Sequence, residues 1–328
     1  MSEFRITTPE KGEWNDFVKA CNGSIFQLYE MKEVYDRTKN YRSLLLAVKG
    51  SNEIKAGMLA ELRDEKPGFL GFATRAVVEG GPLYSEKEAL KALIREYDKL
   101  VKGKAVFSQF FNLHEMSDAN HALAEEGYSF EDELNYLISL EKSEGELFSG
   151  IHKSRRKNIK KAEGKVNIVK MEKEQLPVFY NLVKATLDRA RVPVADISLY
   201  ESAFEILKPK GMAHFYLAEY DREFIGARAV LDCNGVIYDW AAGASEKHLD
   251  LFPNDILVWH ILKSNAGKRK YFDFQGAGKP GSNYGPGEFK RRFGGKEVNY
   301  GRFKKIISPV KNKVTMAGFK IYQKIKWR

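Results

Sequence analysis

The sequence predicts an α/β protein, α+β in the stricter sense, built from two domains of one design. Its 328 residues are about the length of two ordinary domains. Strand-like and helix-like patterns of apolar residues alternate along the whole chain. The stretches AVKGSNEIKAGMLAEL and AEYDREFIGARAVL, one in each half, share a pattern of strand, polar turn and strand.

In the first half, residues 43–62 predict two strands joined by a Gly-Ser-Asn turn. Residues 69–84 predict another strand, which ends at a Gly-Gly-Pro turn. Residues 87–101 have helical spacing, and residues 105–113 return to strand. The helical face is formed by Ala89, Leu93, Tyr97 and Leu100.

The second half repeats this order. Residues 214–231 predict a strand hairpin, and residues 235–245 predict a further strand. A helix over residues 254–268, capped by Asn254 and ended by Gly267, leads to the short strand YFDF. We therefore expect domains over residues 1–145 and 146–308.

Residues 309–328 predict a C-terminal helix with one apolar stripe: Val310, Val314, Ala317, Ile321 and Ile325. Its charged residues are all basic. We expect the stripe to pack on the first domain with the lysines outward. The alternative is attraction to an anionic lipid surface, for which Trp327 and the lysines are suited.

The net charge of +10 is concentrated in two segments. The stretch IHKSRRKNIKKAEGK, residues 151–165, has one acid, Glu163, among its many basic residues, and residues 302–328 have no Asp or Glu. Such local excess favours a specific anionic partner, although a basic stretch is also compatible with a solvated helix face.

Several chemistries have no support in the sequence. Cys21 and Cys233 are the only cysteines, so a disulfide framework or a CxxC metal site is excluded. There is no HExxH, Walker or GxSxG motif, and the six histidines lack ligand spacing. No secretory signal or spanning apolar run is present, so we expect a cytoplasmic protein that can lie peripherally at the inner face of the membrane.

A glycine-rich stretch, FQGAGKPGSNYGPGEFKRRFGG, covers residues 274–295. Glycines such as Gly276 and Gly278 allow the backbone to approach a ligand closely. The stretch also places Lys290 and Arg292 beside Phe289 and Phe293, which suits a charged and partly apolar ligand. The alternative is a solvated loop.

Two units of hairpin, strand, helix and strand resemble the GNAT acyltransferase fold. In addition, HKSRRKNIKKAE, YDWAAGAS, FPNDILVWHILKSNAGKRKYFDFQGAG and EFKRRFGG, in this order, resemble motifs of the FemAB/FemX family of aminoacyltransferases. The resemblance implies tandem GNAT-like domains with a cleft between them. It also implies amino-acid transfer from aminoacyl-tRNA, as co-substrate without a further cofactor, to an amine of a nucleotide- or lipid-linked peptidoglycan precursor.

The same resemblance implies that Lys290 of the FKxxFG-type motif is the catalytic residue. As a point charge, it would stabilise the developing oxyanion or the leaving ribose oxygen. No residue stands out as the general base. The first domain has Tyr35 and Arg37 near the place of a family lysine. The candidate substrate-binding residues are Arg155, Arg156, Lys161, Arg189, Tyr238, Gly276, Gly278, Phe289, Arg292, Phe293, Tyr35 and Arg37.

Two other functions remain open at this point. One is an acyl-CoA-dependent N-acyltransferase on the same fold, although AAGASEKHLD lacks the Q/RxxGxG/A pyrophosphate loop that such enzymes carry. The other is a non-catalytic protein that binds tRNA or anionic lipid.

Overall fold

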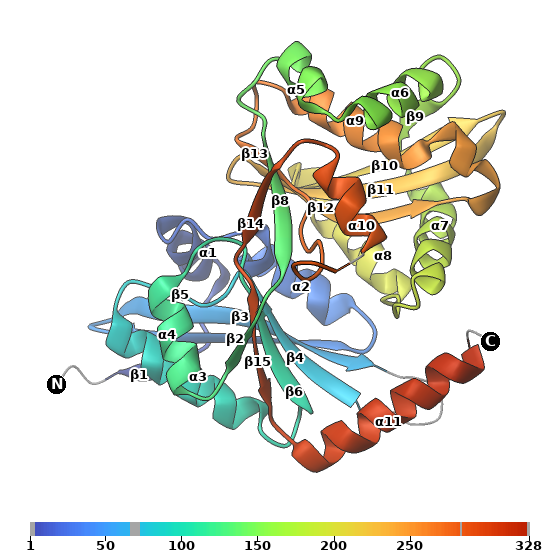
Figure 1. Ribbon diagram of the computed structural model, residues 1–328. Helices are drawn as coiled ribbons and strands as arrows, with labels where there is room; N and C mark the ends of the chain where they lie inside the picture. Colours follow the sequence, from blue (N-terminus) through green and yellow to red (C-terminus); the bar gives the residue numbers. More distant parts are fainter. Residues whose placement is uncertain (1–3, 66–72, 283, 327–328) are drawn as a thin grey trace. The chain divides into compact units, whose positions relative to one another are not determined.

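The computed structural model describes residues 4–65, 73–282 and 284–326 (Figure 1). The chain forms two compact units. The first combines Met1–Asp132 with Tyr300–Arg328, and the second is Glu133–Asn299. These divisions lie earlier than the expected 145/146 and 308/309, because strand β8 (Leu134–Ser139) pairs in the second sheet and strand β15 (Arg302–Ile306) pairs in the first.

The sheet of the first unit has the strand order β1-β2-β3-β4-β6-β15-β7, with β5 paired to β3. Strands β4 and β6 are parallel, and the other pairs in this sheet are antiparallel. The strands are β1 (Arg5–Thr7), β2 (Tyr41–Gly50), β3 (Glu53–Glu65), β4 (Ala73–Glu79), β5 (Leu83–Tyr84), β6 (Phe107–Phe111) and β7 (Ser129–Glu131).

Side chains alternate along each strand, so both faces of this sheet carry side chains to be buried. Helices cover both faces. On β3, Gly57 faces Trp14 of α1 (Lys11–Ala20), whereas the next residue, Met58, belongs to the opposite core cluster. That cluster also contains Leu93 of α3 (Lys87–Val101) and Leu123 of α4 (Ser117–Glu125). Helix α2 (Tyr29–Arg37) follows the 3-10 turn Ile25–Gln27 and contacts β2.

The sheet of the second unit has the order β14-β8-β13-β12-β11-β10-β9. Its further strands are β9 (Asn167–Lys170), β10 (Ala213–Tyr220), β11 (Glu223–Cys233), β12 (Val236–Ala244), β13 (Tyr271–Asp273) and β14 (Lys296–Asn299). One face is covered by α5 (Glu144–Gly150), α6 (Lys153–Ala162) and α9 (Pro253–Asn265). The other face is covered by α7 (Leu176–Arg189) and α8 (Ile197–Ile206), and α10 (Gly285–Arg291) follows β13.

The two units repeat one topology, as the sequence predicts. Strands β2, β3 and β4 are antiparallel neighbours, and α3 leads from them to the parallel strand β6. Strands β10, β11 and β12 follow the same order, and α9 leads to the parallel strand β13. The repeat extends to an exchange of strands, since β15 lies between β6 and β7, and β8 lies between β13 and β14.

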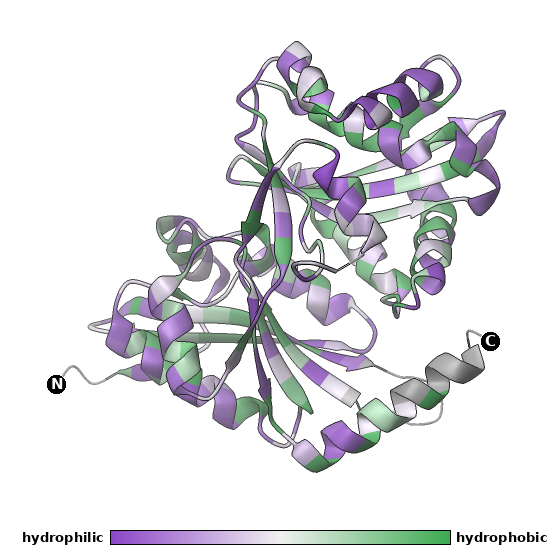
Figure 2. Ribbon diagram, in the orientation of Figure 1, coloured by the Kyte–Doolittle hydropathy of each residue, from purple (hydrophilic) through white to green (hydrophobic). Residues whose placement is uncertain are grey.

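Most predicted elements are confirmed, including both hairpins, the helix over residues 87–101 and the basic helix. Part of the predicted strand over residues 69–84 lies outside the described residues. Asn254 is not the cap of its helix: α9 begins at Pro253, after Phe252 in the left-handed conformation. Figure 2 shows apolar residues concentrated in the strands and polar residues along the outer sides of the helices.

The C-terminal helix α11 (Pro309–Lys326) belongs to the first unit and contacts β4. The prediction that its apolar stripe is buried is wrong for the described side chains. Val310, Val314 and Ile321 are 76%, 59% and 59% exposed, and Ala317 is exposed as well. The helix instead turns Asn312, Thr315 and Gly318 inward, since these residues are half-buried or buried.

Close backbone contact at one glycine fixes α7 on the second sheet. A Cβ atom on Gly243 of β12 would lie 2.3 Å from the Leu182 carbonyl carbon and 2.4 Å from the Val183 nitrogen. No side chain fits in that space, so the helix lies directly against the strand.

Candidate functional site

Helix α6 carries the basic stretch of the sequence and is held by a narrow apolar side. Ile151, Ile159 and Ala162 are 1%, 0% and 0% exposed, as predicted. His152 precedes the helix, and its Nδ1 accepts a hydrogen bond from the Ser154 backbone N–H at 3.3 Å. The other sides of the helix are therefore available for polar contacts.

The outer side of α6 is an open cationic surface. A shallow hollow of about 430 Å³ is lined by Lys153, Arg156, Lys157, Lys160 and Lys161. Within the described part of the chain, no carboxylate forms an ion pair with any of the four lysines. Residues 153, 157, 160 and 161 share one helix face by their spacing. We call these four lysines the α6 lysine face.

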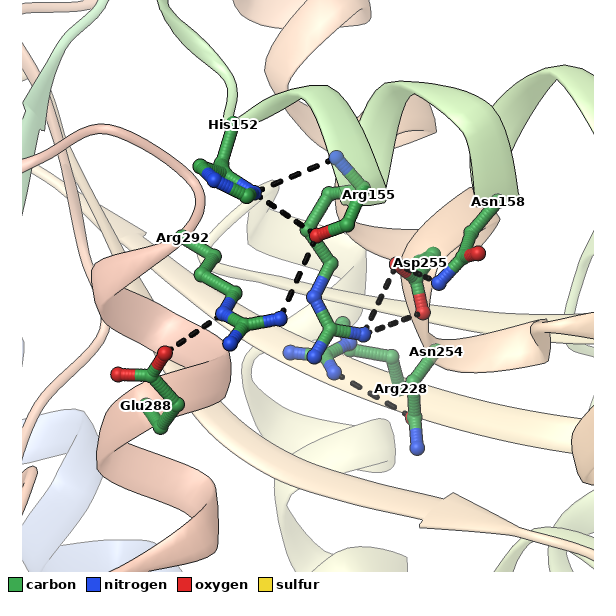
Figure 3. A network of polar contacts seen from close by, with 9 residues as sticks. His152, Arg155, Asn158, Arg228, Asn254, Asp255, Glu288 and Arg292 are labelled. Atoms are coloured by element: carbon green, nitrogen blue, oxygen red, sulfur yellow. Dashed lines mark hydrogen bonds and ion pairs between the residues drawn. The ribbon is translucent and has the colours of Figure 1, made fainter.

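The inner side of α6 carries Arg155 and Asn158 into a polar network with α9 and β11 (Figure 3). The Arg155 guanidinium donates to both oxygens of Asp255 at 3.2 Å and lies 4.7 Å from the centre of the Phe289 ring. Asn158 donates to the same carboxylate at 3.3 Å. Burial raises the pKa of Asp255, and Arg155 opposes that rise.

A second buried ion pair lies beneath this network. Arg228 of β11 donates to the two oxygens of Asp239 on β12 at 2.7 and 2.6 Å, and its other terminal nitrogen donates to Asn254 at 3.4 Å. The register of β11 against β12 shifts at this point, where Ala229 faces Ala241 but Val230 faces Asp239. Trp240 is therefore the extra residue of a bulge, a distortion often found beside functional sites.

Lys290 lies in the last turn of α10, is half-buried, and reaches back to the loop after β13. Its Nζ donates to the carbonyl oxygens of Phe274 at 2.8 Å and Gly276 at 2.7 Å, with a longer contact of 3.4 Å to Gln275. Burial lowers the pKa of this lysine, and Asp239 and Asp273 act in the opposite direction. The cation thus holds three successive carbonyls of the glycine-rich loop.

Two neighbours of Lys290 were missed by sequence reasoning. Asp273 is 2% exposed and accepts hydrogen bonds from Asn135 at 2.7 Å and from the Gln275 N–H at 2.6 Å. Its burial raises its pKa to about 6. Gln275 has a φ of 56°, and its buried Nε2 has no hydrogen-bond partner among the described residues. The YFDFQG stretch carries no signal for either property, because both arise from tertiary packing.

The loop after α10 connects back to the start of α6. Arg292 Nε donates to Glu288 at 2.6 Å, its NH1 donates to Ser154 Oγ at 3.4 Å, and its carbonyl accepts the His152 N–H at 2.9 Å (Figure 3). Hydrogen bonds from Arg291 and Arg292 lower the pKa of Glu288 to about 2. Lys290, Phe289, Arg292 and Arg155 are thereby brought together in the second unit.

Other candidates of the second unit already have internal partners. Arg156 NH1 donates to the carbonyls of Ser149 at 2.6 Å and Ile151 at 3.0 Å, which lie at the end of α5. Arg189 donates to Thr186 and to the Ala244 carbonyl at 2.9 Å, away from the α6 network. Lys161 belongs to the α6 lysine face and lies 5.6 Å from the Phe252 ring centre. Their binding roles stay predictions.

The remaining candidates of this unit are mainly packed or structural. Tyr238 is 6% exposed and Phe293 is 2% exposed, and burial raises the pKa of the Tyr238 phenol. The Gly276 carbonyl holds Lys290, and the Gly278 carbonyl accepts the Leu134 N–H at 2.8 Å. Gly278 has a φ of 87°, and a Cβ atom on Gly276 would lie 2.9 Å from Glu133 Oε1, so both glycines have a structural reason that involves no ligand.

Tyr35 and Arg37 lie in the first unit, near the end of α2. Tyr35 is buried, and its ring centre lies 6.2 Å from that of Tyr41. Arg37 is exposed. The same unit contains a buried charge cluster in which Arg63 donates to Glu61 and, at 2.8 Å, to Glu79.

The chain is similar to several known proteins. Residues 149–291 match a family model described as an acetyltransferase (GNAT) domain. The Lipid II:glycine glycyltransferase of Staphylococcus aureus is 24% identical over 240 residues, which cover 67% of this chain and 56% of that protein. The solved structure of FemX matches 94% of this chain and 99% of its own, with a TM-score of 0.71 and 16% identity.

The likeness to the solved structure of FemX shows the fold of this chain, two tandem GNAT-like units. The chain spans 56% of the length of the curated relatives that it matches. Its fold is also that of a tandem GNAT protein from the clavulanic acid biosynthesis pathway, with a TM-score of 0.62, 12% identity and coverage of 94% and 99%. L-PGS from Bacillus licheniformis is similar at a TM-score of 0.55, 14% identity and coverage of 98% of each chain.

The FKRRFGG stretch has a clear structural basis at Gly294. This residue has a φ of 82°, and a Cβ atom there would lie 2.2 Å from the Gly150 carbonyl oxygen. Only glycine suits both conditions. The glycine therefore seats the end of the loop against α5, while Lys290 holds its beginning.

Two kinds of feature are absent from the described residues of the chain. None of its described helices is both long and apolar enough to span a membrane. No three described side chains of His, Cys, Asp or Glu form a group able to hold a metal ion.

Proposed function

We propose that this protein transfers an amino acid from aminoacyl-tRNA to an amine of a peptide acceptor, a peptidoglycan precursor carried on a nucleotide or a lipid. The likeness to FemX and to a Lipid II:glycine glycyltransferase supports the transferase chemistry and the acceptor class. The single observation that carries the tRNA donor is the α6 lysine face, four exposed cations on one helix that have no acidic partner among the described residues.

The α6 lysine face suits a polyphosphate backbone better than a small anion. Its cations extend over residues 153–161, about two turns of helix, so they can contact successive phosphates. The hollow beside them is shallow, and it lacks the enclosure that small-molecule sites usually have. Long-range attraction by such a surface also accelerates the encounter with RNA.

Lys290 would provide the fixed positive charge near the reacting ester. An aminoacyl ester is already activated, so attack by an amine requires orientation and stabilisation of the oxyanion rather than a covalent enzyme intermediate. The half-buried ammonium group acts at a lower dielectric than that of water, where a point charge is more effective. Its hydrogen bonds to the 274–276 carbonyls keep both the charge and the loop in place.

The test is a transfer assay with purified protein, a pool of charged tRNAs and precursor peptides that have free side-chain amines. We expect a new amide bond, detected by mass spectrometry, whose formation stops when the tRNA is deacylated beforehand. Absence of product with every amino acid and with both nucleotide- and lipid-linked acceptors would rule the proposal out.

Lys290→Met separates catalysis from folding. We expect kcat to fall by at least about 100-fold, the scale of losing one electrostatic stabiliser of a transition state, while the protein remains folded by circular dichroism. Lys279→Met is the matched control, because Lys279 is an exposed lysine of the glycine-rich stretch that leads into α10. Near-normal turnover by Lys290→Met would remove this residue from the mechanism.

The α6 lysine face is tested by the salt dependence of tRNA binding. Lys157→Gln with Lys160→Gln should weaken binding and reduce the slope of log K against log salt by about 0.7 to 0.9 for each lost phosphate contact. The control is Lys102→Gln with Lys104→Gln, two exposed lysines of the first unit. Equal slopes for both double variants would contradict a tRNA role for α6.

The match of residues 149–291 to an acetyltransferase domain favours a second candidate, an acyl-CoA-dependent N-acyltransferase. Thermal stabilisation by CoA thioesters, with none by tRNA, would support it. If tRNA binds but no product forms with any donor, a non-catalytic tRNA-binding role replaces both.

A further inference from the structure

Helix α11 presents an apolar stripe to solvent. At 3.6 residues per turn, Val310, Val314, Ala317 and Ile321 fall within an arc of about 60°. Three of these side chains are more than half exposed, and the fourth is also exposed. The first unit has a complete core of its own, to which this stripe contributes nothing. Exposed branched side chains in a continuous row indicate a surface that is covered in use.

The charges beside the stripe indicate what covers it. Lys311 and Lys313 lie on opposite flanks of the stripe by helical position, and both are exposed. The helix also contains Lys320, Lys324 and Lys326, and it has no Asp or Glu. An apolar row between lysines matches the layers of a bilayer surface, where apolar side chains enter the acyl boundary and ammonium groups remain at the phosphates.

We propose that α11 is an interfacial anchor that lies in the plane of an anionic membrane, with Val310, Val314, Ala317 and Ile321 inserted. RNA could pair with the lysines but would leave these apolar side chains in water. A protein partner would need a groove both apolar and acid-rimmed, whereas an anionic lipid surface supplies both features everywhere. The helix is not apolar enough to span the bilayer, which is consistent with a position in its plane.

The proposal does not depend on the transferase reaction. It concerns a surface of the first unit, whereas Lys290 and the α6 lysine face lie in the second. A protein that binds vesicles but makes no product would leave the anchor in place and overturn the proposed function. A protein that makes product from a nucleotide-linked acceptor but does not bind vesicles would support the proposed function and overturn the anchor.

The experiment is co-sedimentation of the full chain with vesicles of phosphatidylglycerol and phosphatidylcholine at equal amounts, and with pure phosphatidylcholine vesicles. We expect binding to the anionic vesicles that weakens in 0.5 M salt, and little binding to the neutral ones. Lys311→Gln with Lys313→Gln should reduce partitioning about 25-fold, since each basic residue near an anionic surface contributes about fivefold.

The apolar half of the proposal is tested by Val314→Ser with Ile321→Ser. This pair keeps the charge and should reduce partitioning by at least about tenfold, without altering thermal unfolding, because both side chains are exposed in the folded chain. Val178→Ser with Val192→Ser, two exposed valines of the second unit, is the matched control and should bind as the parent does.

Three results would overturn the anchor. One is parental binding by the Val314/Ile321 variant, and another is equal binding to neutral and anionic vesicles. The third is a loss of tRNA binding, with vesicle binding intact, when the α11 lysines are replaced; that outcome would make α11 an RNA surface.

Discussion

Asp273 gives the sharpest prediction about stability, because its carboxyl group is buried at the end of β13. The folded chain raises its pKa from 3.8 to about 6, chiefly through burial. A raised pKa means that the folded state holds the proton more tightly than the unfolded state. This contribution to stability is complete below pH 3.8 and is lost as the pH rises through 6.

The magnitude follows from the size of the pKa change. One pH unit corresponds to 1.36 kcal/mol, so ionisation of Asp273 in the folded chain costs about 3 kcal/mol. Asp273→Asn removes the ionisation but keeps an oxygen that can accept from Asn135 and from the Gln275 N–H. Because part of this change has already occurred at pH 4, the variant should gain about 2.4 kcal/mol of unfolding free energy relative to the parent between pH 4 and pH 7.

Urea unfolding of both proteins at four pH values in this range, followed by near-UV circular dichroism, measures the difference. Asp250→Asn is the matched control, since Asp250 is exposed, and its difference from the parent should not vary with pH. A constant difference for Asp273→Asn would refute the reasoning. A difference of opposite slope would mean that Lys290 and the two donors outweigh burial.

Three further predictions concern packing and buried charge. Gly243→Ala should lower the free energy of unfolding by about 2 kcal/mol or more, because its Cβ would meet the backbone of α7. Thermal melts measure the change. Gly145→Ala is the control and should have little effect, because the space around Gly145 is open. Arg228→Met should cost about 3 to 5 kcal/mol by leaving Asp239 buried without its cation, and adding Asp239→Leu should restore part of that loss in denaturant unfolding. Arg156→Gln should lower stability by about 1.5 kcal/mol through lost hydrogen bonds to α5. The salt slope of tRNA binding by the same variant tests the predicted binding role of Arg156: a reduced slope would show that it contacts phosphate, and an unchanged slope would remove it from the binding residues.

The repeated units were predictable because their signals are local. The alternation in residues 43–62 and 214–231, with a polar turn between, specifies hairpins without knowledge of the rest of the chain. The exchanged strands were not predictable. Strands β8 (LNYLIS) and β15 (RFKKI) are short, and nothing in their residues says which sheet they join.

The candidate site also contains residues that were predictable from the sequence and residues that were not. The glycine-rich stretch and the basic helix identified Lys290, Arg292 and Arg155 from sequence, and the structure brings these residues into one region of the second unit. Their acidic partners, Asp255 and Asp273, escaped notice because burial, not residue type, makes them unusual. The α11 stripe was recognised, but its direction depends on which side of the helix meets β4.

The exchange of strands has a consequence for how the protein is made on the ribosome. The second unit is continuous in sequence, so it can complete its sheet once residue 299 has emerged. The first unit is synthesised earlier but must wait for β15, which fills the place between β6 and β7. Until then the edge of β6 lacks its neighbour, and an open strand edge invites pairing with other chains. The unit that is translated first is thus the last to complete its sheet.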